Sequence, residues 1–339
     1  MNTLGVRKAK KLIMLLLVFL VLLLLTGLSF WQFNHRLLAV DPEDSVLIEV
    51  TVSSNSNTAR IASQLAEKGL INNPDIFIWY CRLKGYDSQL QAGVYQFGKS
   101  QGIPEMVQDL VAGRVKSKTI TIPEGYDLRQ IGELFVAREI CSLEEWQTAV
   151  LKDYDYEFLR DIPKRDNRLE GFLFPETYRI RDGASPEELI KMMLSQFSKV
   201  WDEQFSAAAE QSGLTTYRVI TLASMVEKEG RHDEERPRIA GVIFNRLQIG
   251  MALQIDATVL YSLGGHKDRV LLKDLEVDSP YNTYRNTGLP PGPIASPGAV
   301  SIQAVLQPEK HDYYYYVTSE GGYHTFSRTY EEHLRAKNK

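Results

Sequence analysis

The residues with the clearest chemical potential lie in the stretch ASMVEKEG, between Ala223 and Gly230. In a helix, Glu227 follows Ala223 by four residues and Ile220 by seven, so it continues an apolar stripe and does not join the solvent-facing side. An apolar wall disfavours the charged form of an acidic side chain. A carboxylic acid that keeps its proton near neutral pH can act as a general acid. The spacing therefore makes Glu227 a candidate catalytic acid.

The helix that carries Glu227 has recognisable ends. Thr215 or Thr216 can cap its N-terminus, and Gly230 is a natural C-terminal stop. Glu227 then lies in the last turn, where the negative end of the helix dipole also favours the protonated acid.

A structural explanation of Glu227 competes with the catalytic one. A glutamate at a helix end commonly pairs with a nearby cation, and Lys228, Arg231 and Arg246 are available. Glu229 also competes for the catalytic role, because spacing alone does not separate it from Glu227. The pattern leaves both alternatives open.

Other kinds of catalytic site are not indicated. The sequence has no G-x-S-x-G, no H-E-x-x-H and no phosphate-binding glycine loop. Its six histidines lack metal-ligand spacing, and Cys81 and Cys141 are too far apart for a zinc or redox pair. We therefore expect no metal and no cofactor. The net charge of -4 also provides no basic surface for nucleic acid.

The N-terminal segment predicts a membrane anchor. Cations at positions 7, 8, 10 and 11 precede an apolar run over residues 12–30, and Trp31 follows. About 20 apolar residues span a bilayer as a helix, and the cations keep the preceding tail in the cytoplasm. A cleaved signal peptide would have a shorter apolar core and a small-x-small site after it. We expect a cytoplasmic tail over 1–11, one uncleaved helix through the membrane over 12–31, and the rest of the chain outside the cytoplasm.

After a short connector, the pattern predicts a small α+β unit. The run VLIEVTV, over 46–52, alternates like a strand, and AGVYQF, over 92–97, predicts a second strand. Helical patterns over 58–68 and 74–84 lie between them. Strand, helix, helix, strand resembles the LysM-like module, which in other proteins binds glycans that contain N-acetylglucosamine. A spacer domain without a ligand is the alternative.

A second strand and helix are expected over 118–136, separated by a turn at Glu124-Gly125. Ser142 then begins a capping box. A long pair of helices from Pro186 to Gln211 leads to the helix of Glu227.

Loops and short elements follow the central helix. Asp256 can cap a short helix over 257–263. The run from Pro280 to Gly298 is a long loop rich in proline, glycine and aromatic residues, and a loop of this length within a domain is usually functional. A hairpin that turns at Gly321-Gly322 and a charged helix end the sequence.

Several of these strings together resemble a known family. ASMVEKEG, IAGVIFNRLQIGMALQIDATVLY, YNTYRNTGLPPGPIASPG, EGFLFPETY and HTFSRTYEEH are similar to strings of the YceG-like endolytic murein transglycosylases. The resemblance covers nearly everything from the anchor to the C-terminus, and the combination is highly specific. One departure is Ala257, since the family more often has proline after the aspartate of its L-Q-x-D string. That difference concerns the shape of a turn and not the assignment.

The resemblance implies the organisation of the chain. It implies an α+β, membrane-anchored, multidomain protein with a LysM-like βααβ domain over 45–115, a strand-helix connecting region over 116–165 and a mixed α/β catalytic domain over 166–339. The implied partners are the glycan strands of peptidoglycan, the cytoplasmic membrane through one helix, and a peptidoglycan synthase.

The resemblance also implies roles for individual residues. Glu227 matches the first glutamate of the V-E-K-E string, which is the catalytic acid of the family, and Glu229 becomes a supporting residue. Tyrosine, amide and carboxylate side chains can stack on sugars or bond to their hydroxyl groups. On these grounds six residues are expected to contact sugar: Glu170, Gln254, Asp256, Tyr281, Asn282 and Tyr284.

The implied reaction is a lytic cut within nascent glycan strands, which ends their elongation. Protonated Glu227 donates to the glycosidic oxygen between N-acetylmuramic acid and N-acetylglucosamine, and its carboxylate then accepts the C6 hydroxyl proton as a 1,6-anhydro ring closes. A muramidase-type hydrolase is one alternative, and it needs a second carboxylate at roughly 5–5.5 or 6.5–9.5 Å, for which Glu170 and Asp256 are candidates. A non-catalytic scaffold that binds glycan and a synthase is the other.

Overall fold

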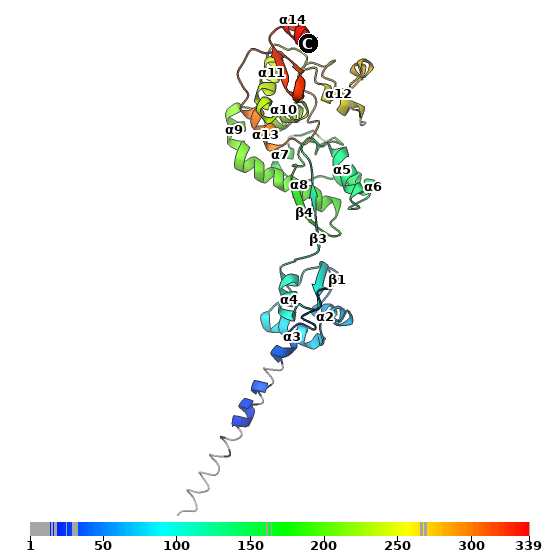
Figure 1. Cartoon of the computed structure of the whole chain (residues 1–339), viewed down its shortest axis with the longest axis vertical. Coiled ribbons are helices and arrows are strands. Elements are labelled where there is room, and N and C mark those ends of the chain that lie inside the picture. Colours follow the sequence, from blue (N-terminus) through cyan, green and yellow to red (C-terminus); the bar gives the residue numbers. More distant parts are fainter. Residues whose placement is uncertain are drawn as a thin grey trace, which may run out of the picture. The chain divides into compact units, whose positions relative to one another are not determined.

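The chain divides into two compact units between Lys118 and Thr119 (Figure 1). The computed structural model describes residues 14, 16, 19–24, 26–28, 33–160, 162–163, 165–264, 267 and 270–338. Both units combine helices with small two-stranded sheets, so the predicted mixture of helices and strands is confirmed.

The predicted cytoplasmic tail over 1–11 lies outside the described residues, and the predicted transmembrane helix over 12–31 lies only partly within them. Among the residues that the structure describes, no helix has both the length and the apolar character that crossing a bilayer requires. The membrane anchor therefore stays a prediction from the sequence.

The N-terminal unit follows the predicted order of strand, helix, helix and strand. Its elements are β1 (Leu47–Val52), α2 (Thr58–Glu67), α3 (Pro74–Lys84), β2 (Gly93–Gly98) and a further helix, α4 (Ile103–Val111). β1 and β2 pair in antiparallel register, with Val50 opposite Tyr95. Both of these side chains are fully buried, in a core that also contains Phe77 from α3 and Met106 from α4. Burying a large apolar side chain contributes about 1.5–3 kcal/mol, so this core can hold a small unit together.

Local signals set the ends of the two central helices in this unit. The side chain of Asn57 accepts a hydrogen bond from Arg60 N at the start of α2. Asn73 caps α3 in the same way, just before the proline that opens that helix. Gly85 ends α3 in the left-handed conformation, with φ of 71°.

The first strand at the start of the second unit pairs with a strand much later in the sequence. β3 (Ser117–Thr121) pairs with β4 (Thr177–Arg181), and three helices lie between them in sequence. These helices are α5 (Leu128–Ala137), α6 (Leu143–Val150) and the short α7 (Glu157–Arg160). The predicted capping box at the start of α6 is confirmed, because Ser142 and Glu145 exchange side-chain and backbone hydrogen bonds.

A connecting region was predicted over 116–165, and its residues 119–165 belong to the same compact unit as residues 166–339. Aromatic contacts contribute to this union. Phe158 stacks on Phe172 with ring centroids 5.4 Å apart, and Phe172 meets Phe197 edge to face at 5.1 Å. Such ring pairs add about 0.5–1.5 kcal/mol beyond the burial of their area.

A long helical segment in this unit corresponds to the pair of helices predicted from Pro186 to Gln211. It consists of α8 (Pro186–Val200), a π-helical segment (Trp201–Phe205) and α9 (Ser206–Ser212). Ser206 N donates to Trp201 O, which is five residues earlier instead of four. α8 packs against α6, whereas α9 packs against α13 (Ala299–Leu306).

The helix of Glu227 is α10 (Thr216–Glu229), and its predicted N-cap is confirmed: the Thr215 side chain accepts a hydrogen bond from Arg218 N. A short 3₁₀ turn (Asp233–Glu235) leads to α11 (Arg236–Gln248). α10 packs against both α11 and α13, and the three helices lie together in Figure 1. Residues from the ends of these helices therefore meet.

The prediction that Asp256 caps a helix over 257–263 is wrong in one detail. α12 (Asp256–Leu263) already includes Asp256 as its first residue. Ile255 occupies the N-cap position, and its side chain makes no capping hydrogen bond. The Asp256 carboxyl group is engaged elsewhere, because it accepts a hydrogen bond from the Tyr284 hydroxyl group at 2.5 Å.

The C-terminal hairpin and final helix are confirmed. β5 (Tyr315–Thr318) and β6 (His324–Ser327) pair in antiparallel register around a turn at Glu320–Gly322, and α14 (Tyr330–Lys337) follows. A 3₁₀ segment (Leu272–Glu276) lies between α12 and the long loop that ends at Gly298.

Gly132 in α5 gives a test of this packing. Glycine to alanine normally stabilises a helix by roughly 1 kcal/mol, but a methyl group at Gly132 would overlap the Trp146 indole, whose N–H donates to Leu128 O. We expect Gly132→Ala to lower the free energy of unfolding by about 1–3 kcal/mol, measured by urea denaturation. Glu133→Ala, at the exposed neighbouring position, is the control and should change it little. A stabilised Gly132→Ala variant would contradict the tight contact.

Candidate active site

The Glu227 side chain is held at the end of α10 and is only 6% exposed. One of its oxygens, Oε2, accepts three hydrogen bonds. The donors are Arg236 Nη1 at 2.7 Å, Ser301 Oγ at 2.8 Å and Gly298 N at 3.0 Å. None of the described residues donates to the other oxygen, Oε1. The carboxyl group is thus fixed by one oxygen, and the second oxygen is left for another partner.

The three donors come from two neighbouring helices. Arg236 is the first residue of α11, and its Nη1 also donates to Ser301 Oγ at 2.5 Å. Gly298 is the N-cap residue of α13, and Ser301 lies in the first turn of that helix. The positive end of the α13 dipole therefore points toward Glu227.

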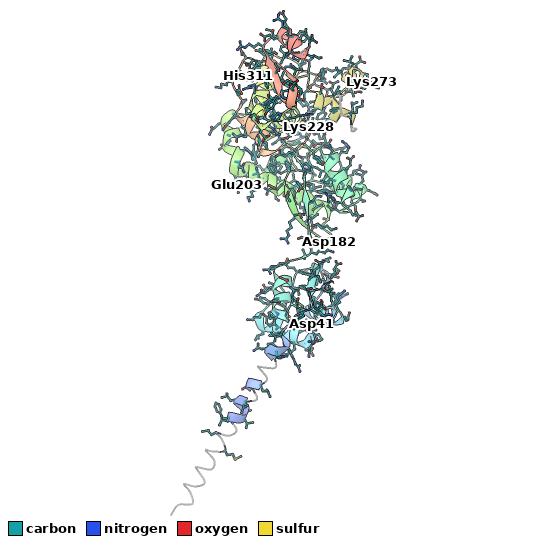
Figure 2. The ribbon with its side chains drawn as sticks, in the orientation of Figure 1. Asp41, Asp182, Glu203, Lys228, Lys273 and His311 are labelled. Carbon is teal, nitrogen blue, oxygen red and sulfur yellow. The ribbon has the colours of Figure 1, made fainter. Side chains whose placement is uncertain are left out.

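This environment differs from the one that the sequence pattern suggested. We expected an apolar wall and the negative end of α10, whereas the structure surrounds the carboxyl group with a guanidinium group, a hydroxyl group and a backbone N–H. The cation is Arg236, and not Lys228, Arg231 or Arg246. Lys228 Nζ donates to Gly125 O at 3.1 Å, and Arg246 donates to backbone carbonyls. Lys228, labelled in Figure 2, marks this end of α10.

The turn after β3 packs directly against Glu227. Gly125 N donates to Ser296 O, and Ser296 N donates to Tyr126 O, both at 2.8 Å. A methyl group added at Gly125 would lie 3.6 Å from Glu227 Cγ, and one added at Gly298 would overlap the Glu124 carboxyl group. Glu124 is therefore a neighbour of Glu227. Burial, and next the charge of Glu227, raise the pKa of Glu124.

Gln254, Asp256 and Tyr284, three of the expected sugar-binding residues, lie close to one another. Gln254 N donates to Thr283 O, and the Tyr284 hydroxyl group donates to Asp256. Gln254 has φ of 50°, a left-handed conformation that a non-glycine residue adopts at a cost of about 1–3 kcal/mol. Both Gln254 and Asp256 are exposed. Their side chains are open to a ligand.

The half-buried acid Glu229 adjoins this group. The Tyr316 hydroxyl group donates to Glu229 Oε2 at 3.0 Å, and burial raises the pKa of Glu229 to about 7. The charge of Asp256 acts in the same direction, whereas Tyr316 and Arg246 oppose it. Glu229 at the end of α10 is thus electrostatically coupled to Asp256.

Asn282 and Tyr281 occupy the inner side of the loop. Asn282 is 0% exposed, and its amide donates to Leu275 O and Val277 O, both at 2.9 Å. A ligand cannot reach this side chain in the structure, so Asn282 braces the loop. The half-buried Tyr281 accepts a hydrogen bond from Asn167 Nδ2 at 2.9 Å.

Glu170 lies in a separate cavity of about 580 Å³, which Trp146, Asn167 and Tyr261 also line. Its carboxyl group accepts hydrogen bonds from Leu128 N at 3.2 Å and from the Tyr261 hydroxyl group at 2.9 Å. Burial, and next the charge of Asp127, raise the pKa of Glu170 to about 8. Glu170 is therefore a neutral acid at pH 7, and neither it nor Asp256 shares a hydrogen-bond partner with Glu227 among the described residues.

Comparison with known proteins decides the family. The model of the YceG-like family matches residues 50–339. The chain belongs to the YceG-like family. A protein of Bacillus subtilis named endolytic murein transglycosylase is 36% identical over 332 residues, which cover 93% of this chain and 91% of that protein.

Two further comparisons agree. A protein of the same name from Streptococcus pneumoniae serotype 2 is 34% identical over 351 residues. The match covers 94% of this YceG-like chain and 63% of the Streptococcus pneumoniae protein. A crystal structure of a YceG-like protein from Listeria monocytogenes matches with a TM-score of 0.59 and 34% identity, over 86% of this chain and 99% of that one.

Sequence reasoning missed two residues next to Glu227 in this YceG-like chain. Arg236 was not among the cations considered, although it is nine residues after Glu227 and begins the next helix. Glu124 was assigned to a turn without any chemistry. An acid directly before a glycine, in a turn after a strand, was the available signal.

The buried acid Glu170 predicts a pH dependence of stability. Because folding raises its pKa to about 8, its stabilising contribution is complete at low pH and is lost as the pH rises through 8. Between the ordinary pKa of 4.5 and the raised pKa of about 8, each increase of one pH unit lowers the free energy of unfolding by up to about 1.4 kcal/mol for such a group. We expect Glu170→Gln to flatten the decline, most clearly between pH 7 and 8, where Glu229 contributes less.

Urea denaturation at pH 5 to 8.5 measures this dependence. Glu176→Gln, at an exposed acid of the same segment, is the matched control and should keep the wild-type slope. Equal slopes for wild type and Glu170→Gln would mean that Glu170 is ionised in the native protein.

Proposed function

We propose that this chain is an endolytic murein transglycosylase, a lyase that cuts peptidoglycan glycan strands internally and leaves 1,6-anhydro-N-acetylmuramic acid ends. Its YceG-like family and the names of its relatives support the activity. The single structural observation that carries the proposal is the Glu227 carboxyl group, which three donors hold by Oε2 while Oε1 receives no bond from the described residues.

The reaction requires two proton transfers at the scissile bond. A proton must reach the glycosidic oxygen as the bond to C1 of muramic acid breaks and its electron pair moves to that oxygen. A base must then take the proton of the C6 hydroxyl group as the C6 oxygen bonds to C1. Glu227 is the catalytic carboxyl group, and its negative charge also stabilises the positive charge that develops at C1.

Arg236, Ser301 and Gly298 act on the orientation of Glu227. Because all three bind Oε2, rotation of the carboxyl group is restricted and Oε1 keeps one direction. Holding a catalytic group in a productive geometry removes part of the entropic barrier. Arg236 is itself 6% exposed, so water competes little for its charge.

The glycan is expected to lie along the group of Gln254, Asp256 and Tyr284. The exposure of Gln254 and Asp256 and the left-handed conformation of Gln254 support this assignment. Tyr281 and Glu170 would contribute to glycan binding through their hydrogen bonds with Asn167 and Tyr261, respectively. Asn282 would contribute by holding the loop in shape.

The placement of the chain in the cell is part of the proposal. The basic cluster and the apolar run over 12–30 support a single-pass anchor in the cytoplasmic membrane, with the catalytic unit on the periplasmic side. The βααβ order of β1, α2, α3 and β2 supports a LysM-like unit in the N-terminal part of the chain. A peptidoglycan synthase is the protein partner that this location favours, because nascent strands emerge there.

A muramidase is the second candidate, and the position of Glu124 favours it. A hydrolase requires a second carboxyl group, and the contacts of Gly298 place the oxygens of Glu124 and Glu227 no more than about 7.5 Å apart. That limit includes the separation of about 5–5.5 Å in retaining enzymes and the lower part of the range of about 6.5–9.5 Å in inverting enzymes. The chemistry of the products distinguishes the two activities.

Mass spectrometry of digested glycan strands tests the proposal. Full-length protein in detergent should convert uncrosslinked strands to fragments with anhydro ends. Glu227→Gln removes the ionisable group but keeps the side-chain shape, so we expect a loss of activity of about 10²–10⁴-fold or more.

Glu176→Gln is the control for this experiment and should digest strands like the wild type. Fragments with reducing ends would identify a muramidase instead. No cleavage by wild type or variant, with glycan binding retained, would support the non-catalytic scaffold.

A further inference from the structure

The cavity beside Glu170 has room for a ligand of its own. Its volume of about 580 Å³ falls within the range of roughly 300–1,000 Å³ that is usual for ligand pockets. It lies between α5, α6, residues 166–170 and the end of α12, and α5 and α6 are neighbours in Figure 1. All of these elements belong to the second unit, which also contains Glu227.

Most of the cavity wall is apolar. Leu128 and Trp146 are buried in it, Val150 is half-buried, and Leu143 and Leu151 are 48% and 61% exposed. A ligand that covers these side chains removes apolar surface from water, which contributes about 25 cal/mol per Å². A sugar ring alone fits poorly, because its hydroxyl groups would face these side chains without hydrogen-bond partners.

Charged and amide side chains stand among the apolar ones. Asp166 and Gln147 line the cavity and are exposed, and none of the described residues forms a hydrogen bond or ion pair with either side chain. Arg129 also lines it; this guanidinium group is paired with Asp127 and Glu133, but the side chain is still 38% exposed. The cavity thus offers an apolar wall together with a carboxylate, an amide and a guanidinium group.

The cavity is close to Glu227. A methyl group added at Gly125 would lie 3.6 Å from Glu227 Cγ, and Leu128 N donates to the Glu170 carboxyl group at 3.2 Å. Gly125 and Leu128 are three residues apart, so their backbones are separated by at most about 11 Å. A side group of a molecule that is bound at Glu227 can therefore occupy the cavity.

We propose that this cavity binds the short peptide that peptidoglycan carries on its muramic acid residues, while the glycan strand lies at Glu227 and along Gln254, Asp256 and Tyr284. The inference rests on the transglycosylase function proposed above and adds a specificity site for the peptide branch of the same substrate.

The chemistry of such a peptide matches the lining. Its alanine residues present methyl groups, which suit the wall that Leu128 and Val150 form. Its free carboxylates and the ammonium group of its diamino acid have opposite charges, and Arg129 and Asp166 provide a partner of each sign. Its amide groups can bond to the Gln147 side chain, which both donates and accepts.

A chain of hydrogen bonds connects the cavity to the loop that is expected to bind glycan. The Tyr261 hydroxyl group donates to Glu170 at 2.9 Å, and Asn167 Nδ2 donates to the hydroxyl groups of Tyr261 and Tyr281, both at 2.9 Å. Tyr281 belongs to the same loop as Tyr284. The two parts of the site are thus held in a fixed relation, which lowers the entropic cost of binding a branched substrate.

Glycan strands with and without their peptides test the proposal in the full-length protein in detergent. An amidase removes the peptides from muramic acid and leaves the length of the glycan unchanged. We expect wild type to cut peptide-bearing strands with a kcat/KM about tenfold or more above that for stripped strands, since filling an apolar pocket changes kcat/KM by at least that factor.

Two variants of the cavity and one control complete the experiment. Val150→Phe narrows the cavity and should lower kcat/KM on peptide-bearing strands to about the value for stripped strands, without changing the latter. Asp166→Asn, at an exposed side chain, should lower kcat/KM about two- to fivefold on peptide-bearing strands only. Val136→Phe, at a position of α5 that is 39% exposed and does not line the cavity, is the matched control and should equal wild type on both.

Equal kcat/KM of wild type on the two kinds of strand would overturn the peptide site. Equal losses on both strands for Val150→Phe and Asp166→Asn would also overturn it and would place a sugar in the cavity instead. Failure of wild type to cut either strand, or reducing ends in its products, would overturn the proposed function itself.

Discussion

The structure of the second unit depends on the charge of one buried carboxyl group. Glu227 and Arg236 are 6% and 8% exposed at the side chain, and separating either from its partner would leave a charge buried without compensation, at a cost of several kcal/mol. The pair forms only if the end of α10 meets the start of α11. Gly298 and Ser301 donate to the same Glu227 oxygen, so the start of α13 must also lie there. A single charge thus fixes the relative position of three helix ends.

The long loop before α13 must hold Gly298 against Glu227, and buried polar residues within the loop fix its shape. Asn282, Thr283 and Ser296 are almost fully buried, and the first two bond to neighbouring backbone or side-chain groups. Such contacts replace the regular hydrogen bonds that a loop lacks. Glu170, in the turn before β4, and Glu229, at the end of α10, add acidic groups to this polar interior, and burial raises the pKa of both.

Local features of the fold could be predicted from the sequence, and contacts between distant segments could not. The cap at Thr215, the capping box at Ser142 and the final hairpin depend on residues within a few positions of each other. The partners of Glu227 are 9, 71 and 74 positions away, so no local pattern reports them. Asn282 shows the same limit: an amide in a loop can face sugar or brace the backbone, and only the packing decides which.

The π-helical segment between α8 and α9 has a mechanical consequence. One additional residue in a turn rotates all later side chains by about 100° around the helix axis. α8 therefore packs against α6, while α9, which buries Ala209, packs against α13, the helix that Gly298 caps and that carries Ser301. A deletion of one residue here would leave the composition of these helices almost unchanged and still rotate α9 away from its neighbour. The number of residues in this segment therefore sets the alignment of α9 with α13.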